Sequence, residues 1–289
     1  MIKESPSRKA FNWFNIAFLS ILSLTMLLPF IHILAGSFSA GTAITQGRVT
    51  LFPVDFTLDN YRVVFNDITL WRAFGVTVLI TVMGTFINLF FTSLMAYGLS
   101  KDHLKGRSLI LFLVIFTMIF SAPLIPTYLT VRALGLLDSI WALILPGTIN
   151  AFNLIIMMSF FRNIPKDMLE AAKIDGCGEY RTLWSVVLPM SLPSLSTIGL
   201  FYAVGHWNGY FAALLYIRNN DLFPLQVKLR RLIVESDAEE MLQAAQLSVQ
   251  SVEGIKMASI IFATLPVLVI YPMIQKHFVK GANLGAIKG

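Results

Sequence analysis

The sequence predicts an all-α membrane protein built from six transmembrane helices, and three observations support this. Of the 289 residues, 56% are hydrophobic and only 13% are charged, whereas a soluble domain carries about 25% charged residues. The mean hydropathy is +0.72. The charges are also segregated, because six long runs contain no Asp, Glu, Lys or Arg: residues 10–47, 73–100, 108–131, 139–161, 182–217 and 257–275.

Each of these runs is long enough to hold a helix that crosses a bilayer, which takes about 20 residues for a ~30 Å hydrocarbon core. Lipid also favours helices, since every backbone polar group must be satisfied internally. The apolar stretch from Phe11 to Phe38 far exceeds the roughly 7–15 residues of a signal-peptide core, so we expect a retained first helix. The expected spans are 12–37, 72–99, 108–131, 139–161, 190–217 and 257–278.

Lys and Arg placement predicts the orientation. With six helices both termini lie on one side, which then holds thirteen of the 22 Lys and Arg residues, while the other side holds nine over much longer loops. Cytoplasmic loops are enriched in Lys and Arg. We therefore expect both termini and the loop 163–189 to be cytoplasmic in a multi-pass membrane protein.

The chain divides into three parts along its length. Residues 1–70 hold the first helix and an external segment, in which Thr57-Leu-Asp-Asn-Tyr61 suggests a short surface helix. Residues 71–280 form a core of five helices, with a second external segment at 218–256. Residues 281–289 form a cytoplasmic tail.

The loop 163–189 predicts a helix–glycine–helix elbow. Pro165 suits the first turn of a helix, where its missing N–H has no cost. Gly176 suits the end of that helix, because glycine accepts the left-handed conformation there. A second short helix then runs from about Glu179 to Val187, before Pro189. The small side chains of Ala171 and Ala172 leave one face open to close approach by a partner.

Residues 170–193 read Glu-Ala-Ala-Lys-Ile-Asp-Gly-Cys-Gly-Glu-Tyr-Arg-Thr-Leu-Trp-Ser-Val-Val-Leu-Pro-Met-Ser-Leu-Pro. This segment resembles the cytoplasmic EAA loop of ABC-importer permeases, and most closely the sugar-importer permeases of the maltose-permease type. The Thr-Leu-x-Asn-Tyr stretch and the tail resemble the same family. The resemblance implies that the loop couples the permease to ATPases through Glu170, Ala171, Ala172, Asp175, Gly176, Leu188 and Pro189.

The resemblance also implies a location in the bacterial inner membrane, an assembly and a mechanism. The expected partners are a second permease, two ATPase subunits and an extracytoplasmic binding protein that delivers an oligosaccharide. ATP and Mg would be held by the ATPase subunits, and the permease would work by alternating access within the membrane lipid. This chain contains no G-x-x-x-x-G-K-[ST] phosphate loop, in agreement with a subunit that has no nucleotide site or cofactor of its own.

Other functional classes fit the sequence poorly. The four histidines are isolated, and neither a hydrolase motif nor a metal-ligand spacing is present, so we expect no catalytic or metal site. The net charge of +6 reflects membrane topology, and no nucleic-acid-binding pattern accompanies it. The alternatives left open are an ABC permease for another solute, a secondary carrier and a membrane scaffold. A secondary carrier usually places carboxylates within its helices, and the six runs hold none.

Polar residues inside a membrane are candidates for a substrate pathway. In the fifth span, Tyr202, His206 and Tyr210 are four residues apart and should share one helical stripe. Aromatic faces beside amide and imidazole groups suit sugars, although helix packing explains such residues as well. The candidate pathway residues are Tyr202, His206, Trp207, Asn208, Tyr210, Asn150 and Asn153, with Asn88 as a further one.

A basic cluster, Lys228, Arg230 and Arg231, lies in the last external segment. It is either a solvated face paired with nearby acidic residues, a docking site for the binding protein, or a lure for anionic sugars such as uronic-acid oligosaccharides. Among specific sugars, it makes an acidic oligosaccharide the favoured hypothesis.

Overall fold

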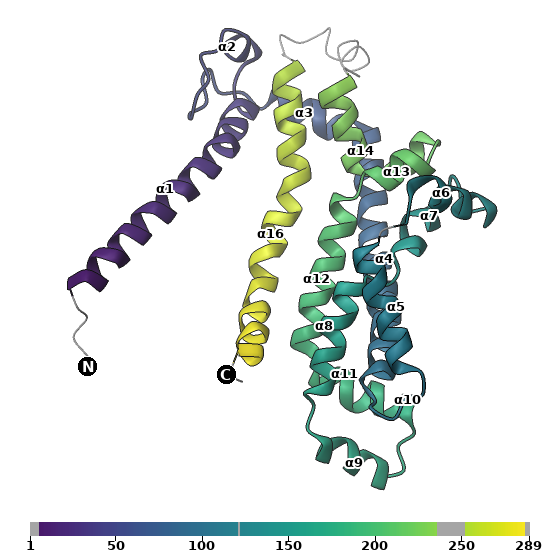
Figure 1. The fold of residues 1–289 in the computed structure, drawn as a ribbon. Coiled ribbons are helices and arrows are strands. Elements are labelled where there is room, and N and C mark those ends of the chain that lie inside the picture. The colour runs from purple at the N-terminus through teal and green to yellow at the C-terminus, as the bar shows by residue number, and fades with distance from the viewer. Residues whose placement is uncertain (1–5, 121, 236–251, 287–289) are drawn as a thin grey trace. The chain divides into compact units, whose positions relative to one another are not determined.

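The structure is a computed structural model that describes residues 6–120, 122–235 and 252–286. Side chains are described over these ranges except for those of Pro6, Glu235, Tyr271 and residues 273–286. Within them the regular structure is helical, apart from one isolated antiparallel bridge between Ser39 and Phe56. The chain forms two compact units, one of Met1–Leu70 with Leu229–Leu265 and one of Trp71–Lys228 with Pro266–Gly289. The all-α prediction is confirmed (Figure 1).

Among the described residues, three helices are long and apolar enough to cross a membrane by themselves. These lie within α1 (Pro6–Ser37), α4 (Ile68–Ser100) and α16 (Val252–Ala286). Three bent helix pairs raise the number to six if each pair is one span. The remaining helices are α2 (Gly41–Thr45), α3 (Asp59–Asn66), α5 (Arg107–Ile119), α6 (Leu124–Ala133), α7 (Trp141–Ile144), α8 (Ala151–Arg162), α9 (Lys166–Ile174), α10 (Glu179–Thr182), α11 (Leu188–Met190), α12 (Leu192–Asn208), α13 (Phe211–Tyr216) and α14 (Leu225–Arg230).

Three expected spans are therefore broken instead of continuous. The run 108–131 bends by 117° between α5 and α6, and Pro123, which lacks an N–H, precedes α6. The run 139–161 bends by 54°, and α8 begins afresh with Asn150 as its N-cap. The expected span 190–217 is interrupted at Gly209, between α12 and α13. The 85° bend between the segment Glu179–Met190 and α12 coincides with the expected start of that span. Hydropathy detected these runs but could not show the turns within them.

The first unit is organised around a buried asparagine. Asn60, on α3, is fully buried and donates hydrogen bonds to the carbonyl oxygens of Ser37 (3.2 Å) and Ser39 (3.0 Å). The hydroxyl of Tyr61 lies 2.9 Å from that of Ser37. Gly254 of α16 leaves the room for Asn60, since a Cβ there would lie 2.7 Å from its amide oxygen. The Thr-Leu-x-Asn-Tyr stretch thus holds the end of α1 against α3, which is the short helix expected there.

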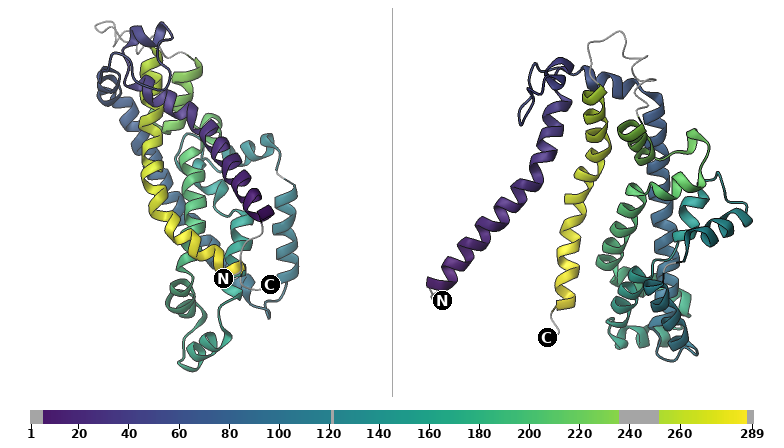
Figure 2. Two further views of the ribbon diagram at one scale, coloured as in Figure 1. Left: turned by 90° about the vertical axis from the view of Figure 1, so that its left-hand side faces the viewer. Right: turned by 45° about the horizontal axis from the view of Figure 1, so that its top comes forward.

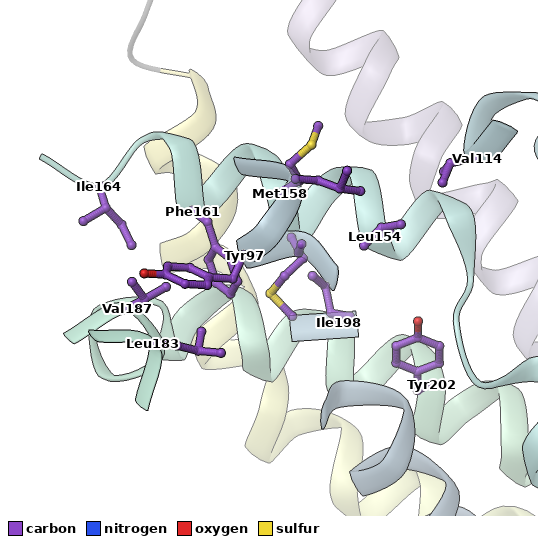
Figure 3. Packing of buried hydrophobic residues seen from close by; sticks show 13 residues of the cluster. Tyr97, Val114, Leu154, Met158, Phe161, Ile164, Leu183, Val187, Ile198 and Tyr202 are labelled. Atoms are coloured by element: carbon purple, nitrogen blue, oxygen red, sulfur yellow. The ribbon is translucent and has the colours of Figure 1, made fainter. Parts of the chain in front are cut away.

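The second unit has one main hydrophobic core. Leu154 and Met157 of α8 and Ile198 of α12 are at most 1% exposed and pack with residues of α4 and α5. Figure 3 shows the same cluster reaching Leu183 and Val187, which follow α10. The core therefore includes the base of the predicted elbow.

The opposite end of the second unit, where α4 begins, is held by polar contacts. Arg72 forms an ion pair with Asp221, and the hydroxyl of Thr77 accepts a hydrogen bond from the Leu225 N–H at 2.8 Å. The carboxylate of Asp138 accepts hydrogen bonds from the N–H groups of Asn219 (2.8 Å) and Arg218 (3.0 Å). These two N–H groups hold the pKa of Asp138 below its ordinary value.

Candidate functional site

The elbow consists of two short helical limbs, and it lies at the end of the second unit remote from α13 and α14 (Figures 1 and 2). The first limb is α9. The second comprises α10, a π-helical turn from Leu183 to Val187, and α11. The first limb contacts both α10 and the π-helical turn of the second. The sequence prediction of two short helices around a glycine is confirmed, although the second limb continues through Pro189 to Met190.

Gly176 makes the turn between the limbs. Its φ is +75°, a conformation that L side chains rarely adopt. Its N–H donates to the Lys173 carbonyl at 3.0 Å, and the Cys177 N–H donates to the Ala172 carbonyl at 2.9 Å. These bonds satisfy the last carbonyl groups of α9, as expected for a glycine-ended helix.

The second limb is anchored in the hydrophobic core. Leu183 and Val187 are each only 1% exposed and pack in the cluster with Phe161 and Ile198 (Figure 3). The π-helical turn that carries them ends two residues before Pro189, whose missing N–H interrupts the regular helical ladder. The second limb is therefore in direct contact with α8 and α12.

A polar clasp adds to this anchor, and we define it as Tyr97, Lys101 and Glu179. The Tyr97 hydroxyl, on α4, donates to a carboxylate oxygen of Glu179 at 2.5 Å. The Lys101 ammonium lies 3.0 Å from the same oxygen and 4.3 Å from the centre of the Tyr97 ring. The Tyr97 hydroxyl and then Lys101 lower the pKa of Glu179, which lies in the loop outside the expected spans. The clasp ties the second limb to the end of α4.

The outward face of the elbow is apolar and open. Ile174 is 86% exposed, Tyr180 78% and Met168 48%. Of the predicted coupling residues, Leu188 is half-buried against the core and Ala172 is buried, whereas Glu170, Ala171, Asp175, Gly176 and Pro189 are exposed. The expectation that both alanines leave one face open is thus wrong for Ala172, because α9 turns that residue towards the interior.

A cavity of about 730 Å³ lies between the two ends of the elbow. It is lined by the last turn of α8, by the entry to α9 at Asn163 and Pro165, and by the entry to α12 at Ser191 and Ser194. The cavity thus lies beside the two connections that join the elbow to α8 and α12.

Two predicted pathway residues meet inside the second unit. The Tyr202 hydroxyl lies 2.7 Å from that of Thr92 and accepts a hydrogen bond from the Asn150 N–H at 3.1 Å. The Asn150 side chain in turn caps α8 by accepting from the Asn153 N–H at 3.1 Å. Tyr202 and Asn153 are 6% and 5% exposed, so in this conformation both act in helix packing.

His206 contacts α4. The amide nitrogen of Asn88 lies 3.1 Å from His206 Nε2. An amide NH₂ can only donate, so in this arrangement the Asn88 amide donates to Nε2. A Cβ at Gly84 would lie 2.5 Å from the same ring nitrogen, which shows that Gly84 provides the space for the ring.

The other three pathway residues do not join this group. Tyr210 is not on the predicted stripe, because α12 ends at Asn208 and Tyr210 is the N-cap residue before α13. Gly209, extended at that point, causes the break. Trp207 is buried edge-on against Phe74, with ring centres 5.9 Å apart. The amide nitrogen of Asn208 donates to its own helix, at the Val204 carbonyl (3.0 Å).

The basic cluster lies on α14 and the π-helical turn that follows it. Arg230 is exposed, whereas Lys228 and Arg231 are half-buried. The acidic residues expected to pair with them, Asp237, Glu239 and Glu240, and the side chain of Glu235, lie outside the described residues.

Sequence reasoning missed the clasp and the hydroxyl groups along α4. A charge pair across 78 positions has no local signal. The hydroxyl groups along α4 did have a local signal, because polar residues recur there at steps of three and four in an otherwise apolar run. These residues are Thr77, Thr81, Thr85, Asn88 and Thr92.

Comparison with known proteins gives consistent similarities. Residues 106–283 match the family of binding-protein-dependent transport system inner membrane components. Protein LplC of Bacillus subtilis (strain 168) is 49% identical over 287 residues, which are 99% of this chain and 97% of that protein. The polygalacturonan/rhamnogalacturonan transport system permease protein YtcP of the same strain is 47% identical over 97% of this chain and 99% of its own length. A chain in the crystal structure of a bacterial ABC transporter involved in the import of the acidic polysaccharide alginate superposes with a TM-score of 0.92. It is 38% identical and covers 96% of this chain and all of its own.

Proposed function

Because the chain belongs to the family of binding-protein-dependent transport system inner membrane components, we propose that it imports an acidic oligosaccharide as one permease subunit of an ATP-driven complex. The other components are a second permease, two ATPase subunits and an extracytoplasmic binding protein that delivers the sugar. Transport proceeds by alternating access, and ATP is hydrolysed on the ATPase subunits.

The single observation that supports this role best is the elbow. Its outward face carries exposed apolar side chains for a protein partner, Met168, Ile174 and Tyr180, while Leu183 and Val187 bury its other side in the core. Because one side of the elbow is open to an ATPase subunit and the other is anchored in the core, the elbow transmits movement of the ATPase subunit to the transmembrane helices.

The substrate class is inferred from chemistry that two relatives share. YtcP is named for polygalacturonan and rhamnogalacturonan, and the structural relative serves import of the acidic polysaccharide alginate. Galacturonans and alginate are both polymers of uronic acids. The charge-free spans of this chain offer no carboxylate that would repel such a substrate.

The orientation follows from the two ends of the second unit. Lys101, Arg107 and Arg162 gather near the elbow, where Asp102 pairs with both arginines. The positive-inside rule supports a cytoplasmic position for this end and for the elbow. With six spans, both termini would then be cytoplasmic as well. The end that holds Arg72, Asp138 and Asp221 then faces the binding protein.

The test is stimulation of ATP hydrolysis in the purified, reconstituted complex. We expect binding protein loaded with a galacturonate oligosaccharide to raise ATP hydrolysis several-fold over unloaded binding protein. Maltotriose, a neutral trisaccharide, serves as the control. Equal stimulation by the neutral control would contradict the acidic substrate class, and no stimulation by any sugar would contradict the role in import.

A further inference from the structure

One face of α4 is polar through the middle of its span. Steps of four, four, three and four residues place five side chains on a single helical face. These are Thr77, Thr81, Thr85, Asn88 and Thr92. Contacts of its members with α12 fix the direction of the face, because Asn88 contacts His206 and Thr92 contacts Tyr202. We call this face of α4, together with His206 and Tyr202, the polar seam.

Two members of the seam are fully satisfied. Thr77 donates to the Ala73 carbonyl (3.0 Å) and accepts from the Leu225 N–H. Thr92 pairs with the Tyr202 hydroxyl. Thr92 thus joins one end of the seam to α12, and Thr77 joins the other end to the start of α14.

The members between them are not satisfied. Among the described side chains, the hydroxyl oxygens of Thr81 and Thr85 and the amide oxygen of Asn88 are buried and have no hydrogen-bond partner. Asn88 as a whole is only 2% exposed. Threonines in a helix usually bond the carbonyl four residues back, as Thr77 does, but Thr81 and Thr85 do not. A buried polar group without a partner costs free energy, and this cost is concentrated at mid-span.

The chemistry of the three atoms limits what binds them. They are two hydroxyls and an amide, all neutral, within a run that contains no charged residue from 73 to 100. Neutral donors and acceptors in a row match the hydroxyl groups along a sugar, and they include no positive charge to pair with its carboxylates.

We propose that Thr81, Thr85 and Asn88 form a binding strip for sugar hydroxyl groups, exposed when α4 and α12 separate during transport. This inference rests on the proposed function. In the conformation of the structure His206 contacts the strip at Asn88, where Gly84 leaves room for its ring, and Tyr202 contacts Thr92 next to the strip. On opening, hydroxyls of the passing sugar take the hydrogen bonds that the closed conformation leaves unmade.

The test uses threonine-to-valine substitutions, which remove a hydroxyl with little change in shape. The variants are made in the complete complex in proteoliposomes, with binding protein saturated by a labelled galacturonate trisaccharide. For T81V/T85V we expect the uptake rate to fall at least about fourfold, because two hydrogen bonds of ordinary strength to the passing sugar are lost. We expect the melting temperature of the complex to stay the same or rise, because two unsatisfied buried groups are removed.

Two controls separate this role from a structural one. T92V removes a hydroxyl that is bonded in the closed state and should lower the melting temperature. T117V, on α5, removes a hydroxyl that bonds its own helix (Thr117 to the Val114 carbonyl, 2.7 Å) and should leave uptake unchanged. Unchanged uptake in T81V/T85V overturns the proposal, as does a loss of uptake matched by a loss of melting temperature. Failure of the wild-type complex to import any sugar would instead refute the proposed function.

Discussion

The amide nitrogen of Asn88 lies 3.1 Å from Nε2 of His206 and joins two helices whose residues are 118 positions apart in the sequence. His206 is therefore directed towards α4, inside the second unit. Sequence reasoning had placed it on an aromatic stripe with Tyr202 and Tyr210. The contact with Asn88 makes the α4–α12 seam, and not that stripe, the place to look for the sugar pathway.

The space at Gly84 gives the first prediction. In G84A the new Cβ would meet His206 ring atoms at 2.5 to 2.9 Å, so the ring must move and lose its bond to Asn88. We expect a loss of about 0.5–1.5 kcal/mol in stability, seen as a lower melting temperature of the complex. G75A on the same helix meets nothing within 4 Å and should be neutral or stabilising. Equal melting of the two variants would refute the close contact.

The second prediction concerns the clasp of Tyr97, Lys101 and Glu179. Y97F or E179Q should lower the sugar imported per ATP roughly 2- to 10-fold, the effect of an interaction energy of about 0.5–1.4 kcal/mol. ATPase subunits should still co-purify, because the clasp lies behind the docking face. The double variant should lose no more than the stronger single variant.

The matched control for the clasp is R48Q, which breaks the exposed ion pair of Arg48 with Asp55 (3.0 Å) and should have almost no effect. Loss of ATPase subunits from E179Q would show instead that Glu179 is a docking residue.

The third prediction tests the turn of the elbow. G176P cannot adopt the observed φ of +75° and loses the N–H that bonds Lys173. Uptake should fall sharply while the protein still inserts in the membrane. G178S, two residues on, has φ −68° and open space around it, and serine is a good N-cap, so it should transport normally. Normal transport by G176P would disprove the need for this turn.

The fourth prediction tests the orientation. A single cysteine in place of the exposed Gln46, in a C177A background, should react with an impermeant thiol reagent added to spheroplasts. The native Cys177 should react only after the membrane is made permeable. The reverse pattern would invert the topology and place the elbow on the wrong side for ATPases.

Much of the fold was predictable because lipid imposes a simple rule on composition. The charge-free runs located the helical segments, and Gly176 and Pro165 gave the elbow and its limits. The bends near Pro123 and Asn150 and the break at Gly209 were not predicted, since hydropathy averages over the positions at which a helix turns. Pro123 is visible in the sequence, but proline also occurs inside continuous helices here, as at Pro29 and Pro266.

The candidate site was predictable where it is local and missed where it depends on tertiary contacts. The EAA-like loop is one continuous segment, so its residues could be named from the sequence. The pairs Tyr97–Glu179 and Thr92–Tyr202 join distant segments and leave no local pattern. Tyr202 and Trp207 were chosen for their chemistry, yet their burial depends on helix rotation, which a nearly uniform apolar helix does not reveal.

The most direct test of the central claim is uptake of a labelled galacturonate trisaccharide into proteoliposomes that hold both permeases and the ATPase subunits. We predict that uptake requires ATP and loaded binding protein together, and that G176P abolishes it while G178S does not. Uptake without ATP or without binding protein, or equal uptake by G176P and the wild type, would contradict the claim that this chain is the elbow-driven permease of an ATP-powered importer.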